Sequence, residues 1–145
     1  MRFASAVFAL LLALPAAADA AEPEKRAGLL VLDSVRAPAD AAATFKKTVE
    51  AKGVTVIATV DHAGAARKAA LEMEDAVLLI FGNPKIGTPL MQDAPTMAAD
   101  LPMRAIFWRQ DGRNWAATIA PAALAQRHGL AADDPRIAKL RGALT

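Results

Sequence analysis

The residues whose types and spacing best suit ligand binding lie in one glycine- and proline-rich stretch, residues 82–89 (GNPKIGTP). An apolar run that predicts a buried strand precedes it, and Thr88-Pro89 is a typical helix start. Backbone N–H groups at a helix N-terminus attract anions, and Lys85 would add a full positive charge. Gly87 would let a ligand approach the main chain closely. We therefore predict a site for a small carboxylate or phosphate, formed by Asn83, Lys85, Gly87 and Thr88.

The same stretch also has a simpler interpretation. Its asparagine, glycine and proline residues are typical of turns and helix caps, with Lys85 in solvent. Nucleotide hydrolysis is disfavoured, because a P-loop needs lysine and then serine or threonine directly after its second glycine. Here Thr88 follows Gly87 directly. A ligand site and a purely structural turn therefore both remain open.

Asp61 and His62 complete the predicted ligand site. His62 could also act as a general base with a carboxylate, either Asp61 or the distant Asp100, as a small hydrolase or isomerase requires. The simpler interpretation makes Asp61 the N-cap of a short helix that carries His62 on its first turn. His128 precedes a glycine at a predicted helix end, where an imidazole can contact the last carbonyl groups. Catalytic residues therefore stay unassigned.

Metal and cofactor sites are not expected. The chain has no cysteine, and its two histidines are far apart in the sequence without a helical Glu-x-x-His spacing. A preformed zinc site needs three or four such ligands, so we predict neither a metal nor a cofactor.

The pattern of elements predicts an α+β fold. Strand-like and helix-like segments alternate, and the chain then ends with a hairpin and further helices. Asp111-Gly112 suits a two-residue hairpin turn, and that register puts Trp108 opposite Trp115. We predict a two-layer sandwich of a mixed, largely antiparallel sheet with helices on one face. The second face of the hairpin is also apolar, so either the chain's own segments or a second subunit in a homodimer would cover it.

Segment by segment, strands are expected at residues 29–36, 54–60, 76–81, 103–110 and 113–119. Helices are expected at residues 39–52, 61–72, from Thr88 to before Pro95, from Pro121 to Gly129, and after Asp134-Pro135.

Composition and the first residues bound the class of protein. The chain has 145 residues, 54% of them hydrophobic, with 17 basic and 15 acidic side chains spread along it. This even charge predicts no nucleic-acid partner. Arg2, an apolar run too short to span a bilayer, and an A-x-A site at residues 18–20 predict a signal peptide. We expect residues 1–20 to be removed and residues 21–145 to form one exported, periplasmic or secreted domain without a stable membrane anchor.

Four stretches taken in order resemble a known family. They are Asp61-His62-Ala63, residues 81–91 (FGNPKIGTPLM), residues 100–105 (DLPMRA) with the Trp115 hairpin, and residues 127–130 (RHGL). Together they are similar to the domain of unknown function 302 (DUF302). The resemblance covers roughly residues 31–130 and implies an α+β fold, often dimeric, with no agreed activity.

One departure from that family limits what can be transferred. Members commonly carry a tyrosine and Asn-Asp before the proline that follows the hairpin, whereas this chain has Thr118, Ile119 and Ala120 before Pro121. Roles that depend on those groups do not carry over to this chain.

Three hypotheses about function follow. The first is an exported, soluble, non-enzymatic binding or accessory domain whose small anionic ligand meets residues 82–89 and His62. The second is a small hydrolase or isomerase that uses His62 with a carboxylate. The third is a structural module that dimerises through the hairpin.

Overall fold

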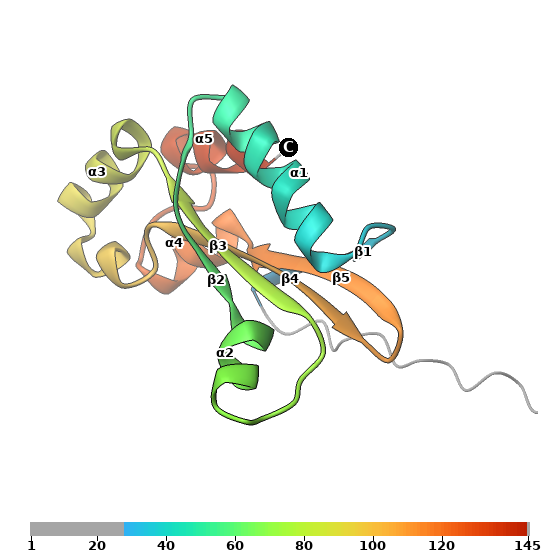
Figure 1. The fold of residues 1–145 in the computed structure, drawn as a ribbon. Coiled ribbons are helices and arrows are strands. Elements are labelled where there is room, and N and C mark those ends of the chain that lie inside the picture. Colours follow the sequence, from blue (N-terminus) through green and yellow to red (C-terminus); the bar gives the residue numbers. More distant parts are fainter. Residues whose placement is uncertain (1–27, 145) are drawn as a thin grey trace, which may run out of the picture.

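The computed structural model describes residues 28–144, and the predicted signal peptide lies outside them. Five strands form one sheet in the order β1-β5-β4-β3-β2, and every neighbouring pair is antiparallel (Figure 1). The strands are β1 (Leu29–Ser34), β2 (Thr55–Asp61), β3 (Ala76–Gly82), β4 (Met103–Gln110) and β5 (Arg113–Ile119). The helices are α1 (Pro38–Ala51), α2 (His62–Lys68), α3 (Pro84–Asp93), the 3-10 helix η1 (Pro95–Ala99), α4 (Pro121–Arg127) and α5 (Pro135–Leu144).

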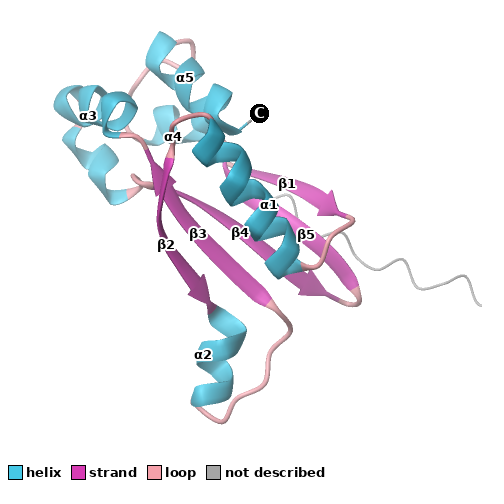
Figure 2. Ribbon diagram, turned by 45° about the horizontal axis from the view of Figure 1, so that its top comes forward, coloured by secondary structure: helices cyan, strands magenta, loops and turns pink. Residues whose placement is uncertain are grey.

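The α+β fold and the two layers are confirmed. Helix α1 lies across one face of the sheet (Figure 2), where Phe45 meets Phe81 of β3 and Phe107 of β4 at ring-centroid distances of 5.2 and 5.6 Å. Burial of such aromatic side chains is the main force holding the two layers together. The predicted mixed sheet is wrong among these strands, because β1 and β2 lie at opposite edges. The α1 crossover therefore makes no parallel pair.

The C-terminal hairpin matches the predicted register. Trp108 lies opposite Trp115, and their rings stack with centroids 6.4 Å apart. Asp111 and Gly112 form the turn with positive φ angles of 51° and 76°, which the right-handed twist of a tight hairpin favours. Local turn chemistry was therefore sufficient to fix this pairing.

Strand β2 departs from the expected strict alternation. Val56 pairs with Phe81, but Ala58 pairs with Ile80, so Ile57 forms a bulge. Directly opposed residues share a face of a sheet. Val56 therefore lies on the α1 face, and Ala58 lies on the other face rather than beside Val56.

Helix α3 begins earlier than the sequence predicted. Asn83 is its N-cap and Pro84 its first residue, so the expected start at Thr88-Pro89 is wrong. An asparagine cap followed by proline is itself a strong start signal. Pro89 lies inside the helix, where it has no N–H group to donate to the preceding turn.

The helices other than α1 gather at the two ends of the sheet. In Figures 1 and 2, α3, α4 and α5 surround the end where β3 finishes, whereas α2 lies at the opposite end. None of the helices in residues 28–144 combines the length and the apolarity needed to cross a lipid bilayer.

Candidate functional site

A cavity of about 410 Å³ lies between α3, α5 and the adjoining ends of β2, β3 and β4. Its volume is within the range of small-molecule sites, roughly 300–1,000 Å³. Most of its lining is aliphatic, aromatic or thioether surface: Val54, Ile57, Phe81, Pro84, Ile86, Met91, Leu101, Pro102, Met103, Leu140 and Ala143. Thr55, Gly82, Asn83, Gly87 and Thr88 complete it, and no charged side chain is among these residues.

Asn83 is committed to the backbone around the cavity. Its Oδ1 accepts a hydrogen bond from the Lys85 amide at 2.9 Å, and its Nδ2 donates to the Gly53 carbonyl at 3.1 Å. The side chain therefore caps α3 and ties it to the turn before β2. Asn83 shapes the cavity, as the structural interpretation of the sequence expected.

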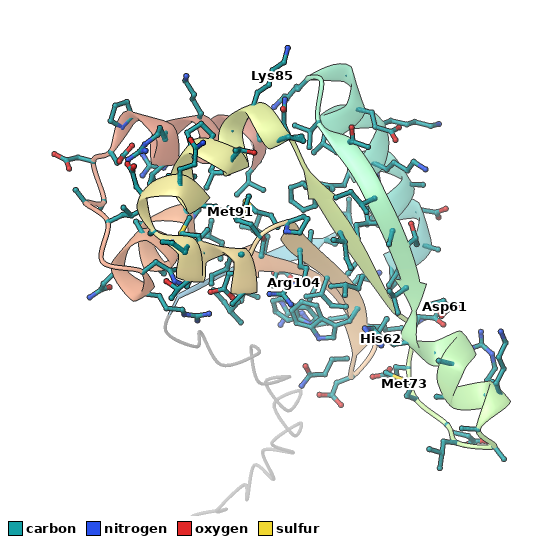
Figure 3. All side chains as sticks on the ribbon, turned by 90° about the vertical axis from the view of Figure 1, so that its left-hand side faces the viewer. Asp61, His62, Met73, Lys85, Met91 and Arg104 are labelled. Atoms are coloured by element: carbon teal, nitrogen blue, oxygen red, sulfur yellow. The ribbon has the colours of Figure 1, made fainter. Side chains whose placement is uncertain are left out.

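The geometry removes the backbone basis of the expected anion site. In the first turn of α3, Pro84 has no N–H group, and the amides of Lys85, Ile86 and Gly87 all donate to Asn83. Lys85 is exposed and is absent from the cavity lining. Figure 3 shows its side chain directed away from the molecule. The amides of this turn are therefore already bonded, and an apolar cavity lies beside them.

Asp61 and His62 lie far from the other predicted site residues. Thr55 pairs with Gly82 at one end of β2, and Asp61 pairs with Val77 at the other end. Six residues of strand at ~3.3 Å each separate the two ends by roughly 20 Å, and Figure 3 shows Asp61 and His62 at the end opposite Lys85. The structure therefore does not bring Asp61 and His62 together with the predicted site residues of α3.

Asp61 is the N-cap that the alternative interpretation predicted. Its Oδ1 accepts a hydrogen bond from the Gly64 amide at 2.8 Å, and its Oδ2 lies 3.6 Å from Arg67. Within residues 28–144, His62 makes no hydrogen bond or ion pair with a carboxylate. The hydrolase hypothesis based on His62 therefore has no geometric support.

A polar cluster that the sequence analysis did not assemble surrounds Asp100. Its carboxylate accepts a hydrogen bond from His128 Nε2 at 2.7 Å and pairs with Arg127 Nη1 at 3.0 Å and Arg104 Nη2 at 3.5 Å. His128 Nδ1 lies 2.8 Å from Thr96 Oγ1. The hydrogen bond from His128 and the Arg127 guanidinium hold the pKa of Asp100 below its usual value, although partial burial opposes them. We call Thr96, Asp100, Arg104, Arg127 and His128 the Asp100 cluster.

The role expected for His128 changes accordingly. It is the C-cap residue of α4, but its imidazole bonds Asp100 and Thr96 rather than the last carbonyl groups. Positions 100 and 128 belong to two of the stretches that carried the family resemblance, which is the one signal that could have linked them. Across the described residues 28–144, no three histidine, cysteine or acidic side chains are placed to hold a metal ion.

Comparison with protein families identifies the chain. The model of the family described as "Domain of unknown function DUF302" matches residues 32–145, so the chain belongs to the DUF302 family. The crystal structure of an uncharacterized conserved DUF302 protein from Bacillus stearothermophilus superposes with a TM-score of 0.70 at 14% identity. That match covers 81% of this chain and 93% of the other, and it confirms the fold.

Curated proteins that are similar to this chain are named as ion channels. A 104-residue stretch, 71% of this chain, is 39% identical to fluoride-specific ion channel FluC 1 of Brucella suis biovar 1 (strain 1330) and covers 41% of it. Fluoride-specific ion channel FluC 2 of Brucella melitensis biotype 1 matches at the same identity, with 38% of its length covered. The chain thus spans about two-fifths of the length of these relatives.

Proposed function

We propose that the chain is an exported DUF302 domain that binds a small, mainly apolar ligand in the cavity between α3 and α5. The observation that carries this proposal is a cavity of about 410 Å³ whose lining has no charged side chain. Burial of apolar ligand surface would supply the affinity. Binding there would be non-enzymatic, because none of the lining side chains is an acid, a base or a strong nucleophile.

An arginine links the two helices that flank this cavity. Arg136 of α5 donates to the Pro89 carbonyl of α3 at 3.0 Å and also pairs with Asp93 at the end of that helix. Asp134 holds the same guanidinium, with Oδ2 2.6 Å from Nη2. This link supports the proposal, because a preformed cavity avoids the entropic cost of ordering its walls when a ligand binds.

Three compounds distinguish an apolar ligand from an anionic one. Decanol has a long apolar tail and no charge. Decanoate has a long apolar tail and a negative charge, and acetate has a negative charge but no long tail. In thermal unfolding of the full chain, we expect decanol and decanoate to raise the Tm saturably and acetate to leave it unchanged. Stabilisation by acetate alone would instead support the anion site predicted from the sequence.

Blocking the cavity locates the binding. A Cβ atom at Gly87 would lie 3.6 Å from Leu101 Cδ1 and 3.9 Å from Met91 Cε, so the side chain of Gly87→Leu would enter the cavity. Gly142→Leu is the matched control, since it adds the same side chain to a helix where no atom lies within 4 Å. Decanol should stabilise the control but not Gly87→Leu. Equal stabilisation of the two variants would place the ligand elsewhere.

Export is supported by the sequence pattern of residues 1–20. Expression of the full chain in a bacterium tests it, because a processed periplasmic protein should begin near Ala21. Retention of Met1 in a cytoplasmic fraction would contradict export. N-terminal mass analysis of fractionated cells distinguishes the two outcomes.

The Brucella relatives favour an accessory role near an ion channel. Because this chain corresponds to about two-fifths of their length, we propose that it resembles an accessory part of them rather than the whole channel. The cavity itself would not bind fluoride, because its lining is mainly apolar and the first-turn amides of α3 already donate to Asn83. Sodium fluoride and sodium chloride should therefore have equal effects on the Tm. A shift specific to fluoride would contradict this assignment.

A homodimer is the second candidate role, and edge strand β1 favours it. Leu30 and Leu32 are 46% and 67% exposed there, and Arg113 neutralises Asp33 across a 2.9 Å ion pair. Unpaired edge strands are normally protected by free charges. Antiparallel pairing of two copies about a two-fold axis at Val31 would place Leu30 opposite Leu32 of the partner subunit.

The absence of native cysteine allows a simple test of the dimer. Oxidation of Val31→Cys should give a covalent dimer, whereas Thr59→Cys on the opposite edge strand should not. Light scattering should show that Leu32→Glu shifts the chain to monomer. A monomeric wild-type chain across all concentrations would contradict the proposal.

A further inference from the structure

The Asp100 cluster contains a continuous hydrogen-bonded chain from a hydroxyl through an imidazole to a carboxylate. Thr96 Oγ1 lies 2.8 Å from His128 Nδ1, and His128 Nε2 lies 2.7 Å from Asp100 Oδ2. A nucleophile within hydrogen-bond reach of a base that a third group orients is the arrangement that activates a hydroxyl. The three residues come from η1, from the residue after η1 and from the end of α4, so only the fold brings them together.

The charges around Asp100 determine where the protons lie. Arg127 and Arg104 both pair with its carboxylate, which stays ionised and can only accept hydrogen bonds. His128 Nε2 must therefore carry a hydrogen and donate it. In the neutral imidazole Nδ1 is then the acceptor, and the Thr96 hydroxyl donates to it.

The three hydrogen-bonded side chains differ in their exposure to solvent. The side chains of His128 and Asp100 are only 6% and 13% exposed, whereas Thr96 is exposed. Shielding keeps the imidazole oriented, and exposure leaves the hydroxyl open to a substrate.

We propose that Thr96 is the nucleophile and His128 the general base of an acyl-transfer site that hydrolyses esters of small carboxylic acids. Asp100 is a positioning residue that fixes the tautomer and orientation of His128. This site is separate from the proposed ligand cavity, and neither proposal depends on the other.

Each step balances in atoms and protons. Thr96 Oγ1 attacks the carbonyl carbon of the ester and forms the new C–O bond as its proton passes to His128 Nδ1. The bond to the alcohol oxygen then breaks, and that oxygen takes the proton from Nδ1. Water attacks the acyl-threonine, gives a proton to Nδ1, and releases the acid as the Thr96 oxygen regains its proton.

The surroundings indicate which esters would fit. Arg104 and Arg127 are half-exposed and add two positive charges beside the single negative charge of Asp100. Arg104 pairs across the sheet with Ile80 and shares its face with Ile106, so apolar surface adjoins these charges. Esters that carry a second, anionic group should therefore react faster than neutral ones.

The covalent intermediate provides the direct test. The full chain is incubated with 4-nitrophenyl acetate, quenched in acid, digested and mapped by mass spectrometry. We expect an acetyl group on Thr96 of the wild-type protein. Absence of acetyl-Thr96, or acetylation of lysines alone, would overturn the proposal whatever the variants do.

Variants separate catalysis from structure. Thr96→Val should lower 4-nitrophenolate release by at least roughly 100-fold, because it removes the attacking oxygen, while Thr96→Ser should restore it. Thr44→Val is the control, because among residues 28–144 the Thr44 hydroxyl donates only to the Asp40 carbonyl, at 2.8 Å within α1. Wild-type turnover by Thr96→Val would overturn the proposal.

An ester that carries an anionic group tests the role of Arg104 and Arg127. After the release measured in buffer alone is subtracted, we expect 4-nitrophenyl hydrogen adipate to react faster than 4-nitrophenyl acetate at low salt, with the difference reduced by Arg104→Met. A faster reaction with the neutral ester would overturn the predicted preference.

Discussion

Two neighbouring residues belong to regions of opposite chemistry. Leu101 lines the cavity, where no charged side chain is present, whereas Asp100 anchors a cluster with two arginines and a histidine. The cavity is bounded by apolar surface from several elements. The Asp100 cluster instead depends on a few short polar contacts that must all be present together.

This difference predicts opposite responses to substitution. An apolar wall tolerates added volume as long as space remains beside it. Removal of one partner of a partly buried ion pair lowers the free energy of unfolding, because the other partner is left desolvated and unpaired. Substitutions in the two regions should therefore change the free energy of unfolding with opposite signs.

The largest effect is expected at the centre of the polar region. Asp100→Ala leaves Arg127 and His128 without their shared acceptor, so we expect a loss of about 2 kcal/mol in the free energy of unfolding. Urea denaturation measures it. Asp33→Ala is the control, since its ion pair with Arg113 is exposed and should contribute less than about 1 kcal/mol. Equal losses in the two variants would contradict the comparison.

A smaller effect of the opposite sign is expected in the cavity. Gly87 lies inside α3, and a Cβ atom there would make ordinary van der Waals contacts. Gly87→Ala should therefore stabilise the protein by roughly 0.5–1 kcal/mol, the usual difference between glycine and alanine in a helix. Chemical denaturation measures the change. Destabilisation would mean that the wall cannot accept even one methyl group.

Stability at acid pH tests the link that Arg136 makes between α3 and α5. The Arg136 side chain and amide lower the pKa of Asp134 to about 2. A depressed carboxyl pKa adds stability that is complete above the unfolded value of about 4 and is lost as the pH falls toward 2. Asp134→Asn should therefore flatten the fall in urea midpoint over this range. An unchanged acid profile would contradict the role assigned to this carboxylate.

The smallest effect is expected at Lys85. Its side chain is exposed and lies outside the cavity lining, so Lys85→Ala should change stability by less than about 0.5 kcal/mol. The affinity for decanol, measured by titration calorimetry, should also be unchanged. A weaker affinity for decanoate alone would show that Lys85 contacts the carboxylate of a bound ligand.

Much of the fold could be predicted because its signals are local. The turn at Asp111-Gly112 fixed the hairpin register, and Asp61 was predicted as a helix cap and is one. Errors arose where two local signals competed. Asn83-Pro84 and Thr88-Pro89 both suit a helix start, and only packing decides between them.

The candidate site was harder to predict for a physical reason. Asn83, Gly87 and Thr88 do line one cavity, but the residues that make it apolar come from β2, β3, β4, α3 and α5. The bulge at Ile57 reverses the faces of β2, which a strict alternation hides. Nothing in the spacing of residues 96, 100 and 128 indicates that they touch.

The sequence by itself determined the class of fold, the hairpin pairing and the membership of the DUF302 family. These depend on turn chemistry, hydrophobic periodicity and short motifs, all of which operate over a few residues. The tertiary structure alone decided that Lys85 faces solvent, that His62 lies far from the cavity, and that His128 meets Asp100 and Thr96. Such contacts join segments far apart in the chain, and they form because burial of the core against α1 fixes the ends of the sheet on which these residues lie.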